Sequence, residues 1–170
     1  MLSALAGDRP VIGLEPSCLL TLRDEFPALL PGEATRDLAG RALLLSEFLA
    51  REKPALELRP IATVAHVHGH CHQKSFGAFP DTLAMLRFVP ELQVRPIPAS
   101  CCGMAGAFGY QAETLAVSKS MAEAGFLPAV RQAAAEELIV ADGTSCRHQI
   151  ADLAGRKALH SVRVLAQALR

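Results

Sequence analysis

The sequence of 170 residues lacks several features that mark common classes of protein. It has 17 basic and 17 acidic residues and so no net charge that would draw it to nucleic acid or to an anionic membrane. It has no apolar run of roughly 20 residues, the length that spans a bilayer. Its start, MLSALAGDRP, lacks the basic and apolar segments of a signal peptide. These absences predict a cytoplasmic protein without a membrane span and without nucleic acid as a partner.

The glycine pattern of dinucleotide-binding domains is also missing. No G-x-G-x-x-G follows an apolar strand, and the glycine-rich stretch GMAGAFG at 103–109 has a different spacing. We therefore expect the chain to bind no FAD by itself and to oxidise no substrate alone.

What the sequence does contain is five cysteines, an odd number that a closed disulfide framework cannot use completely. Reducing compartments keep thiols free, so cysteines there more often bind metals or act in catalysis. Cys101 and Cys102 are adjacent, and adjacent cysteines seldom bridge each other because the small ring is strained. A thiol–disulfide enzyme is disfavoured because the C-x-x-C arrangement is missing. Metal binding is the favoured interpretation.

Four short β-rich runs alternate with stretches of helical periodicity. The runs are Val11–Leu14, Thr63–Gly69, Gln93–Pro98 and Glu137–Ala141, and helices are expected over 35–52, 79–89, 111–136 and 160–170, the third broken near Gly125 and Pro128. This alternation predicts a single α/β domain over 1–170. Its core would be an open, mostly parallel sheet of about four strands with flanking helices, resembling half of a Rossmann domain.

Each predicted strand is followed by cysteine: Cys18, Cys71, the pair Cys101–Cys102, and Cys146. Ligands of open α/β sheets bind beyond the carboxyl ends of the strands. We therefore expect all five thiols at one edge of the sheet, where they would form a metal site.

VIGLEPSC and LIVADGTSC form a faint internal repeat of apolar strand, turn, serine and cysteine. Ser17 and Ser145 are expected to be helix N-caps, which would place Cys18 and Cys146 in the first helical turn. There the helix dipole favours the thiolate, the form that binds metals. The repeat indicates a duplicated half-domain, although a strand followed by a serine-capped helix is common in α/β folds.

The adjacency of Cys101 and Cys102 favours an iron–sulfur cluster over a single zinc ion, because adjacent thiolates converge poorly on one small tetrahedral ion. The following Gly103 and Gly106 would let the backbone approach the cofactor and donate N–H groups to its sulfurs.

Histidines 66, 68, 70 and 72 alternate, as would residues on one face of a strand, opposite Cys71. We expect His66 and His68 to lie on a solvated face. His70 and His72 either flank the metal or sit on that same face. Three further residues lie close to cysteines in the sequence: Lys74, Arg147 and His148. They either balance the negative charge of the thiolates or are ordinary surface residues.

HCHQKS around Cys71, SCCGMAGAFGY around Cys101 and Cys102, and DGTSCRHQI around Cys146 resemble the cysteine-rich CCG domain. That family includes one of the subunits of heterodisulfide reductase, the iron–sulfur subunit of glycolate oxidase and the C-terminal part of FAD-linked D-2-hydroxy-acid dehydrogenases. The resemblance is greatest to this last group. It covers nearly the whole chain, with 1–55 as the remnant of a first CCG half and 56–170 as a complete second half.

The resemblance implies an iron–sulfur electron-transfer module that passes electrons from a flavin to an acceptor. It implicates Cys71, Cys101, Cys102 and Cys146 in one site and assigns Cys18 to another. FAD would belong to a partner domain or subunit, and the complex would place the module beside the inner membrane. The C-x-x-C that ends the fullest form of the motif is absent here, which favours an ordinary 4Fe–4S cluster or a zinc ion. A zinc-binding or metal-free interaction domain is the alternative. A half-domain should also expose apolar surface and form a homodimer or larger assembly.

Overall fold

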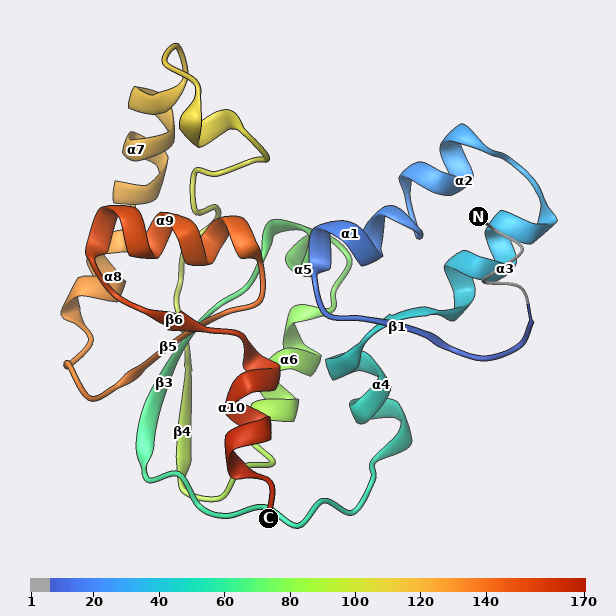
Figure 1. The fold of residues 1–170 in the computed structure, drawn as a ribbon, viewed down its shortest axis with the longest axis horizontal. Helices are drawn as coiled ribbons and strands as arrows, with labels where there is room; N and C mark the ends of the chain where they lie inside the picture. Colours follow the sequence, from blue (N-terminus) through green and yellow to red (C-terminus); the bar gives the residue numbers. More distant parts are fainter. Residues whose placement is uncertain (1–6) are drawn as a thin grey trace.

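The structure is a computed structural model that describes residues 7–170, so the first six residues of the start considered above lie outside the described residues. Its centre is a four-stranded parallel sheet with strand order β4-β3-β5-β6, flanked by helices (Figure 1). The strands are β3 (Thr63–His68), β4 (Leu92–Pro96), β5 (Leu138–Ala141) and β6 (Ala158–Leu159). The predicted fold class is confirmed.

Helices cover both faces of this sheet. One face is covered by α8 (Phe126–Gln132) and α9 (Thr144–Ala154), and the other by α6 (Phe79–Leu86) and α10 (Ser161–Ala168). Helix α5 (Cys71–Ser75) follows β3, and the segment after β4 carries a 3-10 turn η2 (Phe108–Tyr110) and α7 (Leu115–Glu123). The predicted helix over 111–136 is broken at Gly125, as expected. Alternation along β5 divides the core, because Ile139 and Ala141 pack in a cluster with Phe126 while Val140 packs in the other cluster with Met85. A strand buried on both faces reads as a continuous apolar run.

Residues 7–52 form an N-terminal lobe beside the main sheet (Figure 1). Its elements are β1 (Val11–Gly13), α1 (Pro16–Thr21), α2 (Glu25–Leu29), α3 (Glu33–Arg41), β2 (Ala42–Leu44) and α4 (Leu45–Glu52). The single helix expected over 35–52 is wrong, because strand β2 interrupts it. Ala42 and Leu44 are buried where β2 pairs with β1, and this pairing overrides the helical periodicity. The first predicted strand thus belongs to a separate two-stranded sheet.

The two copies of the repeat share their strand register. In the N-terminal lobe β1 pairs in parallel with β2, with Val11 opposite Ala42 and Ile12 opposite Leu43. In the main sheet β5 pairs in parallel with β6, with Ile139 opposite Ala158 and Val140 opposite Leu159. When Cys18 is aligned with Cys146, Val11 and Ile12 coincide with Ile139 and Val140, so the paired positions of β1 and β5 match. A Gly-Arg dipeptide also stands shortly before β2 and β6 alike. The similarity therefore extends beyond the strand–turn–cysteine pattern.

Among residues 7–170, none of the helices has the length and apolar character needed to cross a bilayer.

Candidate metal centre

Three neighbouring strands deliver cysteines to the same edge of the main sheet. Cys71 begins α5 just after β3, Cys101 and Cys102 lie in the loop after β4, and Cys146 is the third residue of α9 after β5. Because β3 lies between β4 and β5 and all three run parallel, their carboxyl ends meet. The sheet thereby brings together residues that are 75 positions apart in sequence.

The four thiols form a continuous row. The Cys71 side chain contacts that of Cys101, Cys101 contacts Cys102, and Cys102 contacts Cys146. Cys102 and Cys146 are buried at 1% and 0% exposure, whereas Cys71 and Cys101 are only partly covered. The row therefore runs from the core of the domain towards its surface. The structure gathers these four predicted site residues, and their role as metal ligands stays a prediction.

Neighbouring thiols and backbone groups divide the row into thiolates and proton donors. Hydrogen bonds from Cys102 and then Cys71 lower the pKa of Cys101 to about 2, with a further contribution from the Gly103 N–H, 3.3 Å from Sγ. The Cys102 thiol likewise lowers the pKa of Cys146 to about 5, with a smaller contribution from nearby His68. The pKa values of Cys71 and Cys102 are raised, chiefly because they donate to Cys101. The lowered pKa values favour the thiolate form of Cys101 and Cys146, and the thiolate is the form of cysteine that binds a cation.

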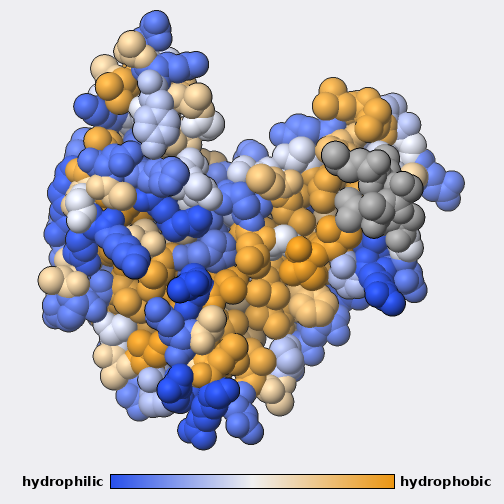
Figure 2. Space-filling view, viewed as in Figure 1, coloured by the Kyte–Doolittle hydropathy of each residue, from blue (hydrophilic) through white to orange (hydrophobic). Residues whose placement is uncertain are grey.

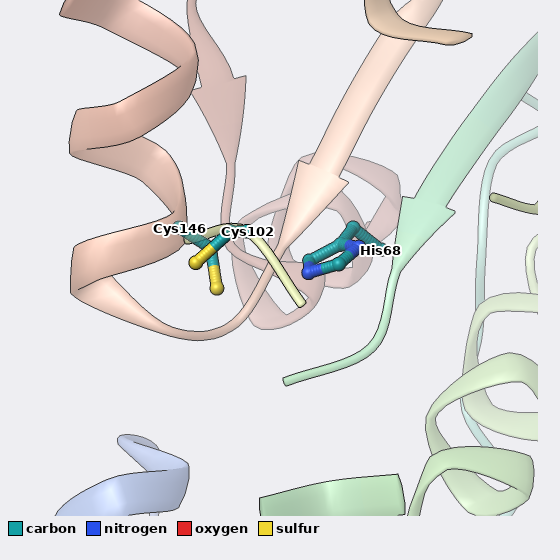
Figure 3. Close-up of side chains that lie close together, drawn as sticks. All are labelled: His68, Cys102 and Cys146. Carbon is teal, nitrogen blue, oxygen red and sulfur yellow. The ribbon is translucent and has the colours of Figure 1, made fainter. Parts of the chain in front are cut away.

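His68, the last residue of β3, joins the buried end of the row. It is 1% exposed, and one of its ring nitrogens lies within 4.8 Å of both the Cys102 and the Cys146 sulfur (Figure 3). Our expectation of a solvated face was wrong, because β3 is a central strand with helices on both sides. The signal that could have indicated this is the position of His68 at the strand end, shortly before Cys71.

The buried donors fit a metal. Neither nitrogen of the buried His68 ring has a hydrogen-bond partner of good geometry, although the ring lies close enough to Cys146 to lower the pKa of that thiol. Buried polar groups normally have a well-placed partner. Ligands held about 2.0–2.3 Å from one tetrahedral ion lie roughly 3.5–4 Å apart. The donors of His68, Cys102 and Cys146 all lie within 4.8 Å of one another, a range that includes this separation.

The predicted row of four histidines on one strand is wrong, because β3 ends at His68. His70 is instead the N-cap of α5, where its Nδ1 accepts the backbone N–H of His72 at 3.2 Å. His66 pairs with Glu137 at 2.8 Å. His72 lies within α5, and its buried Nδ1 has no hydrogen-bond partner.

Side chains around the row fix the loops that carry it. Lys74 donates from Nζ to the carbonyl oxygen of Ser100 at 3.0 Å, just before Cys101. Buried Asp142, at the end of β5, accepts from Gln73 Nε2 at 2.8 Å and from the backbone N–H of Ser161 at 2.9 Å. Arg147 donates to the carbonyl oxygen of Ala141 at 3.0 Å. The two basic residues thus hold the loops as well as adding positive charge.

The two glycines predicted to approach a cofactor differ in their surroundings. Gly103 has a φ of +83°, and an added Cβ would lie 2.2 Å from the carbonyl oxygen of Ser118. Gly106 has a φ of +57°, but an added Cβ would meet no atom within 4 Å. Only Gly103 therefore combines a left-handed backbone with a close approach. Cofactor contact by both residues stays a prediction.

A pocket of about 520 Å³ opens beside the outer end of the row, and it is lined by Cys18, Cys71, Cys101, Gly106 and Tyr110 among others. Figure 2 shows the surface hollowed between the segment that carries α7 and the N-terminal lobe. Cys18 is exposed and lies in the first turn of α1, as Cys146 does in α9. The fifth thiol therefore faces the same pocket from the other lobe.

The predicted serine N-caps are wrong. Glu15 and Gly143 occupy the N-cap positions of α1 and α9, so Ser17 and Ser145 are already helical. The Glu15 carboxylate spans the two lobes, because it accepts the Thr144 N–H at 2.9 Å and the Thr144 hydroxyl at 2.7 Å. It thus occupies the amino end of α9, where a negative charge is favoured.

Comparison with known proteins finds several dehydrogenases. The chain is 31% identical over 163 residues to one of the subunits of anaerobic glycerol-3-phosphate dehydrogenase of Escherichia coli K12, and 31% identical over 168 residues to D-2-hydroxyglutarate dehydrogenase of the same strain. A D-2-hydroxyglutarate dehydrogenase of Pantoea ananatis is 28% identical over 164 residues. No protein-family model and no solved structure matches.

These matches cover nearly all of the chain but only part of each relative. The alignments span 94% and 95% of the chain, 40% of the glycerol-3-phosphate dehydrogenase subunit and 16% of the Escherichia coli D-2-hydroxyglutarate dehydrogenase. The chain is therefore homologous to one segment of oxidoreductases that differ in size and in the substrate they are named for.

Proposed function

We propose that the chain is an iron–sulfur electron-transfer module of a flavin-linked oxidoreductase. The observation that carries the proposal is the row of four sulfurs, Cys71, Cys101, Cys102 and Cys146, at the carboxyl edge of the sheet. Thiolate-rich sites select iron–sulfur clusters or zinc. The homologous dehydrogenases favour the redox-active choice, because dehydrogenation releases electrons that need a carrier.

The distribution of the relatives supports a carrier over a substrate-binding role. The same segment occurs in proteins named for glycerol-3-phosphate and for D-2-hydroxyglutarate. A segment shared by dehydrogenases of different substrates is better suited to a step that follows substrate oxidation. The parent protein would oxidise a D-2-hydroxy acid or related alcohol at a flavin in another domain or subunit.

The residues of the site would hold a 4Fe–4S cluster through the four thiolates. When bound, the cluster supplies one-electron transfer between the flavin and the acceptor. The Gly103 N–H, already directed at the Cys101 sulfur, would stabilise negative charge there. Gly106 and Cys18 line the pocket beside the row, where a partner would approach.

The repeat supports the proposed domain organisation. The matching paired positions of β1 and β5, each with a parallel partner strand, favour residues 1–55 as the remnant of a first CCG half and 56–170 as a complete second half. Cys18 would then belong to the site of the first half. We place the module in the cytoplasm, held beside the inner membrane by its flavoprotein partner.

Anaerobic purification tests this function. We expect iron and acid-labile sulfide in the protein, with broad visible absorption that bleaches on reduction. Cys101→Ser and Cys102→Ser should each cause a large loss of iron, because both thiolates are ligands. Cys18→Ser, outside the row, is the matched control and should keep the iron of the second site. Protein that neither retains iron nor takes it up from ferrous iron and sulfide would refute the proposal.

A zinc-binding module that docks on the same flavoprotein is a second candidate. It is favoured by the grouping of three buried donors, His68, Cys102 and Cys146, all within 4.8 Å of one another, because such a group can surround a single ion. In that case only one of the pair Cys101 and Cys102 would be essential for metal binding. Metal analysis of the two serine variants separates the candidates.

A further inference from the structure

We infer that the imidazole of His68 is itself a ligand of the centre, which makes it a mixed nitrogen and sulfur site. The inference rests on the proposed metal site and changes its ligand set, because a 4Fe–4S cluster takes four protein ligands and His68 would replace one of the four thiolates there. It holds whether the site takes an iron–sulfur cluster or a zinc ion.

The ring of His68 lacks well-placed hydrogen-bond partners. Both of its ring nitrogens are buried and neither has a hydrogen-bond partner of good geometry, although the ring interacts with the Cys146 sulfur beside it. His66, His70 and His160 each have a ring nitrogen in a hydrogen bond at 2.8–3.2 Å. Leaving a buried polar group without a well-placed partner is destabilising. A metal ion would satisfy one of these nitrogens.

The ring of His68 is also held in place by its packing. His68 ends the central strand, and its ring packs on that of Phe126 with centroids 4.1 Å apart. Phe126 is fully buried, so the histidine has little freedom to turn away. Figure 3 shows the ring directed at the space that the Cys102 and Cys146 sulfurs also face. The three donors come from three different segments, β3, the loop after β4, and α9.

A neutral imidazole changes the chemistry of the site. Each thiolate adds a negative charge, whereas a neutral histidine adds none. Histidine ligation raises the potential of iron–sulfur centres relative to all-cysteine ligation. The centre would therefore accept electrons more readily than one with thiolates alone. His68→Cys would restore an anionic ligand and lower the potential.

The experiment measures the nitrogen ligand directly. The full chain is reconstituted anaerobically with ferrous iron and sulfide, and a second sample is loaded with zinc alone. Pulsed EPR of the reduced iron form, with natural and ¹⁵N-labelled histidine, detects a coordinated nitrogen, and X-ray absorption at the zinc edge detects an imidazole in the first coordination sphere. Both measurements are made on the wild-type protein, so they do not depend on whether a variant folds.

Variants identify the histidine. We expect His68→Gln to remove the nitrogen signal and to weaken zinc binding at least about 100-fold, because losing even an outer partner of a ligand costs roughly 10–100-fold. His66→Gln is the matched control, since it lies two residues earlier on the same strand and pairs with Glu137 instead. It should keep both the signal and the affinity. His68→Cys should retain metal without the nitrogen signal.

The outcomes separate this inference from the proposed function. If the iron-loaded protein shows no coordinated nitrogen, the inference is overturned. It is also overturned if the nitrogen signal remains in His68→Gln. Either result leaves the electron-transfer proposal standing. Zinc bound through His68 in protein that takes up no iron supports the ligand and refutes the cluster. Protein that takes up neither metal refutes both. A weak nitrogen coupling typical of a hydrogen bond to sulfur would also overturn direct ligation.

Discussion

Replacing Gly103 by alanine tests how the loop that carries Cys101 and Cys102 is held. The added Cβ would lie 2.2 Å from the carbonyl oxygen of Ser118 and 3.2 Å from Nε2 of Gln149. The first of these atoms belongs to the backbone of α7 and cannot rotate away. The left-handed φ of +83° adds about 1–2 kcal/mol for any residue with a Cβ. Overpacking adds about 1–3 kcal/mol. We therefore expect a loss of about 2–5 kcal/mol.

Gly106→Ala is the matched control, in the same loop and also at a positive φ but with open space around it. Only the conformational cost of about 1–2 kcal/mol applies there. Urea unfolding of the metal-free protein, followed by far-ultraviolet circular dichroism, gives both free energies of unfolding. The reasoning is refuted if the two variants are equally stable, because the contact with Ser118 would then add nothing.

Further expectations concern charge, packing and assembly. Burial acts to raise the pKa of Glu15, but hydrogen bonds from Thr144 and Ser17 outweigh it and leave the pKa below its ordinary 4.5. The carboxylate should thus stabilise the fold fully above about pH 4.5 and lose this effect as the pH falls; Glu15→Gln should cost about 1 kcal/mol at pH 7 and flatten the stability profile below pH 5. Phe126→Ala should lower the free energy of unfolding by about 3–5 kcal/mol. It should also weaken zinc binding more than Phe88→Ala, a change at an exposed aromatic residue; equal affinities would contradict a positioning role. The N-terminal lobe exposes Ile12, Leu14, Leu29 and Leu30, and Figure 2 shows apolar residues spread over it. Sedimentation should reveal a dimer or larger assembly, and a monomer at all concentrations would contradict this.

The sequence predicted best those features that depend on strand ends. Cys71, Cys101, Cys102 and Cys146 could be placed together because parallel strands bring their carboxyl ends to one edge, whatever the loops between them do. The apolar runs also located β3, β4 and β5 to within about two residues.

What the sequence could not indicate depends on tertiary packing. Strand β2 consists of residues that favour a helix, and only its pairing with β1 shows that it is a strand. His68 looked like a solvent-facing residue because alternation does not reveal that a strand has neighbours on both sides. The N-cap of α9 was misplaced because the helix begins at Thr144, whose N–H is bound by Glu15 from the other lobe, a partner that the local sequence does not reveal.

The attachment of the row to adjacent strands also bears on how fast electrons could move. Cys71, Cys102 and Cys146 follow three strands tied side by side by backbone hydrogen bonds, and buried Asp142 links α5 to α10 beneath them. Close-packed interiors resist deformation. A centre held this way changes its geometry little when it gains or loses an electron. The reorganisation energy would stay small, and the barrier to transfer would then depend mainly on the distance to the partner.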